Sequence, residues 1–228
     1  MAIAVVTSNI SPDGTDGTVD IAAPTGITIG DLLIAIITHG KSGGLPTVTT
    51  PGSSWTHIVS STTDESATAF RSYYKVADSG DAAAGTFTFT LSSSQNHRGG
   101  ILRITGQKSS GFITNSTATG SGSNTTSISF AGFTPTDANS LIIVASGLVG
   151  ASELYSNWAL ATSSPTFTEH IDVGDNPSLG IASVVRPETT DTGNVTITQS
   201  IADHWTALAI AVAPAPAVTN SNFLAFMY

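Results

Sequence analysis

Alternation of polar and apolar residues with a period of two runs through most of the chain and restricts it to β structure. Residues 85–91 read GTFTFTL, and residues 194–198 read NVTIT. Successive side chains of a strand point to opposite faces, so this pattern predicts strands with one buried and one solvated face. Continuous apolar runs at 31–38 and 140–146 predict central strands that are covered on both faces.

The first half of the chain contains a regular series of such segments. We expect strands near residues 2–7, 18–23, 31–38, 55–61, 68–77, 85–92 and 99–105. The sequence has no long 3.6-residue period and no capping box that leads into an apolar stripe, so we expect no helix. Gly, Pro, Asn and Asp interrupt the chain at short intervals, as in all-β sandwiches. The expected fold is therefore an all-β, jelly-roll or Greek-key-like β-sandwich.

Two parts of the chain share this pattern and indicate an internal repeat. TVDIAAPTGITIGDLLIA begins at Thr18, and SISFAGFTPTDANSLIIV begins at Ser127. A shift of 109 residues aligns them without a gap and places Val19 on Ile128, Ile21 on Phe130, Leu32 on Leu141 and Ile34 on Ile143. Residues 85–106 match 193–214 at a shift of 108, which places Phe87 on Val195, Phe89 on Ile197, Leu102 on Ile210 and Ile104 on Val212.

The repeat suggests how the chain is organised. We expect one β-sandwich over residues 1–213, with repeated halves at about 1–106 and 107–213, followed by a tail at 214–228. Residues 107–126 are loop-like in composition, but they contain the apolar pair Phe112–Ile113 where the repeat expects a strand. A shared sandwich is therefore favoured over two tandem sandwiches, although the repeat itself permits both.

The composition limits the possible partners. The chain has 16 acidic and 7 basic residues, a formal net charge of −9, and only 10% charged residues, against about 25% in typical globular domains. Excess negative charge argues against binding to nucleic acid or to an anionic membrane. The absence of cysteine excludes disulfides, thiolate metal sites and cysteine nucleophiles.

The start of the sequence gives an expectation about compartment. MAIAVVTSNIS lacks the basic region and the long apolar run of a signal peptide. Nor does any segment approach the roughly 20 apolar residues of a membrane helix. We therefore expect synthesis in a cytoplasm without a signal peptide.

The polar residues offer few candidates for chemistry. None of the five histidines, His39, His57, His97, His170 and His204, is paired with another at metal-ligand spacing. Asp13, Asp16 and Asp20 lie in PDGTDGTVD and could surround calcium, but Asp-Gly is also common turn chemistry, which we favour. Phosphate-loop, nucleophile-elbow and paired-carboxylate patterns are missing as well. We expect no catalytic residue, metal or cofactor.

Aromatic residues provide a possible binding surface. Trp55, Trp158 and Trp205, together with Tyr73 and Tyr74, could stack against sugars, as in β-sandwich carbohydrate binders. Burial in the core or at its rim is the alternative interpretation, which we favour for each of them.

The most unusual segment lies at the end of the chain. APAPAV at 213–218 precedes SNFLAFMY at 221–228. Pro214 and Pro216 favour extended backbone and cannot donate to a sheet. We expect the spacer to hold the tail away from its own strands, so that its apolar residues dock on a neighbouring subunit or an underlying shell: Phe223, Leu224, Phe226, Met227 and Tyr228. The alternative is that the tail folds back onto its own sandwich.

Several motifs within residues 18–106 occur in a characteristic order: GDLLIA, SSWTHI, RSYYKVA, GTFTFTLSSS and GGILRITG. This order resembles β-sandwich accessory structural proteins of tailed bacteriophages, of the capsid-decoration, head-fibre and tail-fibre type. The resemblance implies a non-enzymatic virion protein that forms homo-oligomers and binds other virion proteins of a capsid or tail. The small size of the chain and the lack of a long fibrous or collagen-like segment favour this hypothesis. A carbohydrate-binding adhesion module is the second hypothesis.

Overall fold

The computed structural model describes residues 2–41, 44–62, 68–150, 152–162 and 165–217. Fourteen strands and one short 3-10 helix, η1 (Asp81–Ala83), make up its regular structure. All strand pairs are antiparallel, so the expected all-β sandwich class is confirmed. Among the described residues, no helix has the length and apolar character needed to cross a bilayer.

The first half of the chain forms two sheets. A five-stranded sheet has the order β1 (Ala4–Ile10), β8 (His97–Thr105), β3 (Leu32–Gly40), β6 (Thr68–Val76), β5 (Thr56–Thr62). A smaller sheet has the order β2 (Thr18–Ala22), β7 (Thr86–Leu91), β4 (Val48–Thr49). Every residue of β3 is buried, as the continuous apolar run predicts for a strand covered on both faces.

The second half is built around two long strands, β9 (Ile113–Phe130) and β14 (Val195–Val212), which pair with each other. Their pairing shifts between Thr198 and Trp205. Before this break β14 also pairs with β11 (Tyr155–Leu160), and after it with β10 (Ser140–Leu148). The sheet continues from β10 to β13 (Ser178–Arg186) and β12 (Thr168–Val173).

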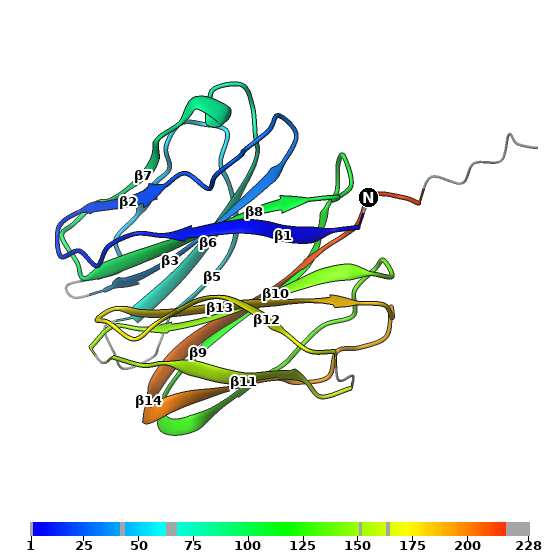
Figure 1. The fold of residues 1–228 in the computed structure, drawn as a ribbon. Coiled ribbons are helices and arrows are strands. Elements are labelled where there is room, and N and C mark those ends of the chain that lie inside the picture. Colours follow the sequence, from blue (N-terminus) through cyan, green and yellow to red (C-terminus); the bar gives the residue numbers. More distant parts are fainter. Residues whose placement is uncertain (1, 42–43, 63–67, 151, 163–164, 218–228) are drawn as a thin grey trace, which may run out of the picture.

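These elements form a stack of layers with three cores (Figure 1). The central core lies between the five-stranded sheet and β10, β12, β13 and the later part of β14. A first outer core lies under the small sheet and contains Val19, Ile21, Leu33, Ile37, Trp55, Phe87 and Phe89. A second outer core lies on the far side of β10 and contains Ile128, Phe130, Val144, Tyr155, Val195, Ile197 and Trp205.

The two halves have the same strand order. In the second half, the start of β9 takes the place of β1, the end of β14 that of β8, and β10, β13 and β12 take the places of β3, β6 and β5. In the same way, the end of β9, the start of β14 and β11 take the places of β2, β7 and β4 in the small sheet. The contacts across the central core are reciprocal: β5 with β9 and β1 with β12, β6 with β14 and β8 with β13. Such reciprocity is typical of two units related by a twofold axis. Superposition of the halves stays a prediction.

One segment differs from expectation. Residues 114–126 look loop-like in sequence, but they belong to the 18-residue strand β9. Ser, Thr, Gly and Asn fill this part of the strand, and most of its residues are half-buried. A partly covered strand at the margin of a sheet does not need alternating apolar residues, so the period of two is lost there.

Candidate docking site at the chain ends

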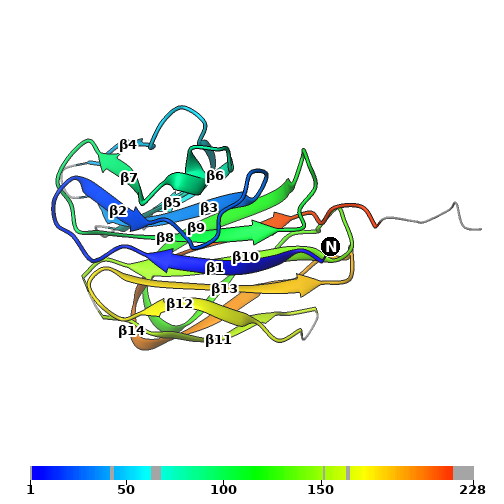
Figure 2. The same cartoon turned by 45° about the horizontal axis from the view of Figure 1, so that its top comes forward.

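The first and last described residues lie at the same end of the stack, beside a groove of about 760 Å³ (Figure 2). Small and apolar side chains dominate its lining, which consists of Ala2, Ile3, Lys108, Asp137, Ala138, Asn139, Val185, Pro214, Ala215, Pro216 and Ala217. Apolar grooves with few polar groups are typical binding surfaces. We call this surface the terminal groove.

Backbone hydrogen bonds fix the segment after β14 to the connection between the two halves. The amide of Ala213 donates to the carbonyl of Phe112 at 2.7 Å, and the amide of Lys108 donates to the carbonyl of Ala213 at 3.1 Å. Beyond Pro214, the amide of Ala215 donates to the carbonyl of Gly106 at 2.7 Å. The Ala-Pro segment is thus attached to the fold through Ala215, further along the chain than the end of β14 suggests.

Gly106 holds the N-terminus against this connection. Its φ is +80°, in the region that favours glycine. A Cβ at this position would lie 2.4 Å from the carbonyl oxygen of Ala2. Glycine therefore permits both the backbone turn after β8 and the close approach of the first residues, which line the groove.

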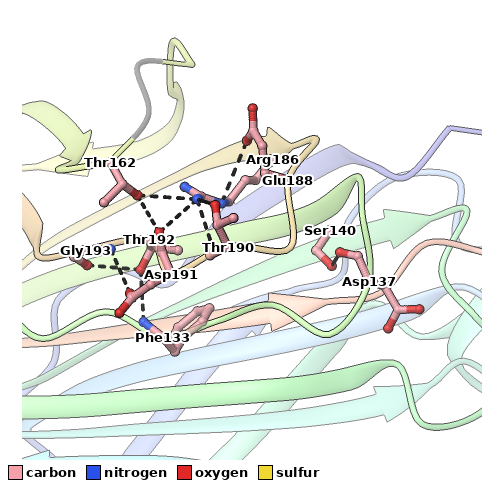
Figure 3. Close-up of polar contacts among 10 residues, drawn as sticks. All are labelled: Phe133, Asp137, Ser140, Thr162, Arg186, Glu188, Thr190, Asp191, Thr192 and Gly193. Carbon is pink, nitrogen blue, oxygen red and sulfur yellow. Dashed lines mark hydrogen bonds and ion pairs between the residues drawn. The ribbon is translucent and has the colours of Figure 1, made fainter.

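One ion pair lies among the groove residues. Lys108 Nζ contacts the Asp137 carboxylate at 2.5 Å, and the two side chains are about one-third exposed. This contact lowers the pKa of the Asp137 carboxyl below its ordinary value, with a smaller contribution from the Thr136 hydroxyl. The carbonyl of Asp137 also accepts a hydrogen bond from Ser140 Oγ at 2.6 Å, which fixes the loop before β10 (Figure 3).

The residues that the sequence assigned to docking, Phe223, Leu224, Phe226, Met227 and Tyr228, lie outside the described residues. The terminal groove itself was not predicted. Its residues come from the ends of separate elements, such as Ile3, Asn139 and Val185, and no local pattern connects them. The sequence feature nearest to it is the repeat, whose aligned segments 85–106 and 193–214 end beside the groove.

Two of the three candidate stacking tryptophans are buried. Trp55 packs edge-on against Phe87 and Phe89, with ring centroids 5.6 and 5.2 Å away. Trp205 belongs to the second outer core. Each is only 7% exposed, so the core interpretation fits both. Tyr73 is also buried, and Tyr74 packs against Phe112 at the central core.

Trp158 is different, because it is only partly buried on β11 and lines a separate groove. Its indole Nε1 donates to Glu169 Oε2 at 3.1 Å. Of the three tryptophans, this one has an environment that a ligand could reach.

The turn that contains Asp13, Asp16 and Asp20 is bonded to β8 through its carboxylates. Asp16 accepts hydrogen bonds from the Thr18 amide at 2.9 Å and from His97 Nε2 at 3.0 Å. The His97 contact is the main cause that lowers the pKa of the Asp16 carboxyl. Asp13 lies 3.6 Å from the buried Arg98 guanidinium, and the Asp20 carboxylate accepts from Thr88. These contacts fit the turn interpretation.

His39 lies opposite His97 in the five-stranded sheet, and three of the other histidine contacts are local. His39 Nδ1 is 2.6 Å from the carbonyl of Gly40, and His170 Nε2 is 2.7 Å from Ser183 Oγ. His204 Nδ1 contacts Asp203 at 2.6 Å. Over the ranges that the structure describes, no group of three or more His, Asp or Glu side chains is arranged to hold a metal ion.

The sequence analysis also did not predict the cluster of polar contacts around the buried Arg186, near the end of β13 (Figure 3). Arg186 is 1% exposed, and its guanidinium donates to the carbonyls of Thr190 and Asp191 at 3.1 and 3.0 Å. In the same loop Thr192 Oγ1 accepts from the Phe133 amide at 2.9 Å. A guanidinium satisfied by backbone carbonyls closes the loop between β13 and β14, so we assign the cluster a structural role.

Comparisons with known proteins give no relative for this chain: no protein-family model, curated protein or solved structure matches it.

Proposed function

We propose that this chain is a non-enzymatic structural protein of a virion, an accessory particle protein that attaches through protein–protein contacts. The observation that carries the proposal is the terminal groove, where Ala2, Ile3 and residues 214–217 gather around one apolar surface. A partner bound at this end would contact the groove and the root of the C-terminal segment together.

Several charged side chains of the described residues hold loops in place, which supports attachment rather than catalysis. His97 and Arg98 hold the 13–20 turn, and Arg186 holds the loop after β13. Lys75 Nζ donates to Asp81 at 2.7 Å beside the short helix. In each case the charged groups connect loops to strands, which is a structural use of ionisable side chains.

The sequence beyond Ala217 supplies the anchor in this proposal. Eleven residues follow Ala217, and five of them are the large apolar residues of the predicted tail. Full burial of one such side chain contributes roughly 1.5–3 kcal/mol, so three or four are enough to hold a partner. The resemblance of residues 18–106 to accessory phage proteins supports a capsid or tail as the place of assembly.

The test is a chain that ends at Ala217, compared with the full chain by light scattering and by binding to purified virions. We expect near-native melting together with loss of oligomers or of virion attachment. Unfolding of the shortened chain would assign the tail to its own core. Unchanged assembly would show that the tail is not the anchor.

A matched pair of substitutions tests the groove itself. Val185 lines the groove and is 40% exposed, whereas Val76 is 42% exposed and is not among the lining residues. Val185→Asp should weaken assembly because a carboxylate would have to be desolvated at the interface. Val76→Asp should assemble like the full unmodified chain. Equal assembly of the two variants would contradict a role for the groove.

A further inference from the structure

Trp158 and Phe167 form an aromatic surface on the outer side of the second half. Both rings pack partly against the second outer core, and both line a groove of about 410 Å³. Asn157, Leu160 and Pro165 are among the other lining residues. We call this surface the Trp158 groove. The terminal groove and the Trp158 groove have no lining residue in common.

A β-bulge places Trp158 in this position. Ser156 pairs with Thr198, but the next pair is Ala159 with Thr196, so Asn157 and Trp158 stand opposite a single residue of β14. Asn157 has a φ of +52°, which is uncommon for a residue other than glycine. Bulges redirect side chains and are frequent beside binding sites.

A carboxylate accompanies the ring. Trp158 Nε1 donates to Glu169 Oε2 at 3.1 Å, which links β11 to β12 and fixes the indole. Glu169 is exposed, so its carboxylate remains open to an incoming ligand. An ionised carboxylate has several acceptor positions and can accept from more than one donor at a time.

We propose that the Trp158 groove binds the ring of a neutral sugar. The negative face of an aromatic ring attracts the weakly positive C–H groups on one side of a pyranose. Trp158 and Phe167 are the two aromatic residues that line the groove. Glu169 would accept hydrogen bonds from sugar hydroxyls. A phosphate or a nucleic acid is disfavoured, because Glu169 and the net charge of −9 repel anions.

This site is independent of the proposed attachment function, since it rests on different residues and a different surface. A particle protein with this site would bind a sugar through residues other than those that attach it to the particle. Loss of sugar binding and loss of assembly are therefore separate results.

The experiment titrates the full chain with glucose, galactose, N-acetylglucosamine and β-linked oligomers of each, followed by tryptophan fluorescence and calorimetry. Trp55 and Trp205 are buried, so a saturable change in emission reports mainly on Trp158. We expect saturable binding of at least one sugar. Absence of binding up to the solubility of every sugar would overturn the proposal.

Three variants locate the binding. Trp158→Ala should weaken it by roughly tenfold or more, as expected when an aromatic contact is lost. Glu169→Gln should also weaken binding while keeping the side-chain size, and Trp158→Phe keeps an aromatic ring if the alanine variant fails to fold. Val185→Asp, in the terminal groove, should bind sugar normally. The assignment would be overturned if the sugar affinity of Glu169→Gln and of the Trp158 variants were unchanged. It would also be overturned if the protein bound tetramethylammonium, a cation without hydroxyl groups, and did not bind the sugars.

Discussion

Val19 of β2 lies opposite Phe89 of β7, and both side chains are fully buried in the first outer core. In the second half, Ile128 of β9 lies opposite Ile197 of β14 in the second outer core. The sequence alignment places Val19 on Ile128 and Phe89 on Ile197. Positions that correspond in sequence are therefore paired in the same way in the two halves.

The same correspondence holds at the central core. Ile34 of β3 lies opposite Leu102 of β8, and Ile143 of β10 lies opposite Ile210 of β14. All four are fully buried and face the other half. The reciprocal contacts of the two halves thus bury equivalent apolar faces against each other, as in an isologous dimer joined into one chain.

The first prediction follows from this shared core. A protease site introduced at the exposed Ser109–Ser110, between β8 and β9, should allow the chain to be cut without separating the halves, because the central core remains buried. Gel filtration of the cut protein should give one species of unchanged size. Separation of the fragments under native conditions would show that the central core is too weak to hold the halves together.

The second prediction concerns the first outer core. Phe89 is fully buried, and the centroid of its ring lies 5.2 Å from that of the Trp55 ring. Phe89→Ala should therefore lower the free energy of unfolding by about 3–5 kcal/mol. Thr90→Ala is the control, because Thr90 is exposed on the opposite face, and we expect a change within about 0.5 kcal/mol. Urea denaturation measures both. Equal, small losses would contradict the burial pattern of β7.

Much of the fold could be predicted because most strands carry their own signal. The alternating segment at 85–91 forms β7 with every second residue buried, as predicted. The apolar runs at 31–38 and 140–146 form β3 and β10, whose residues are all buried. These signals are local consequences of strand geometry, so no knowledge of the tertiary structure was needed to find them.

What could not be predicted depends on contacts between distant segments. The two-residue strand β4 is too short to show a period, and most of β9 has too few apolar residues. Trp55 and Trp158 are the same residue type, yet one is buried and the other is accessible, because only the first is covered by the small sheet. The grooves likewise require the folded arrangement, since their residues come from several elements.

The third prediction tests the closeness of the halves. A Cβ on Gly100 would lie 2.7 Å from Ile171 Cδ1 and 2.9 Å from Ile181 Cδ1, across the central core. Gly100→Ala should therefore lower the free energy of unfolding by about 1–3 kcal/mol. Gly85→Ala is the matched control, because its Cβ would meet no atom within 4 Å. If both variants melt at the same temperature, the two sheets are not in close contact at Gly100.

The last prediction concerns pH and rests on His39. Its side chain is fully buried near the end of β3, the central strand of the five-stranded sheet, and within the described ranges Nε2 has no hydrogen-bond partner. Burial lowers the pKa of His39 from 6.5 to about 4, and the nearby charges of Arg71 and His97 add to this, although the carbonyl of Gly40 opposes it. The folded protein therefore keeps this imidazole neutral at a pH where the unfolded chain protonates it.

Between pH 6.5 and about 4 the unfolded state consequently binds more protons at His39, so the free energy of unfolding should fall as the pH drops through this range. The pKa difference corresponds to a loss of about 3 kcal/mol, most of it reached by about pH 4 and complete below that pH. His39→Gln removes this titration, and its urea-unfolding free energy should vary less over the same range. His57→Gln, at an exposed position of β5, should keep most of the dependence. Parallel pH curves for the unmodified protein and His39→Gln would show that His39 does not cause the loss of stability.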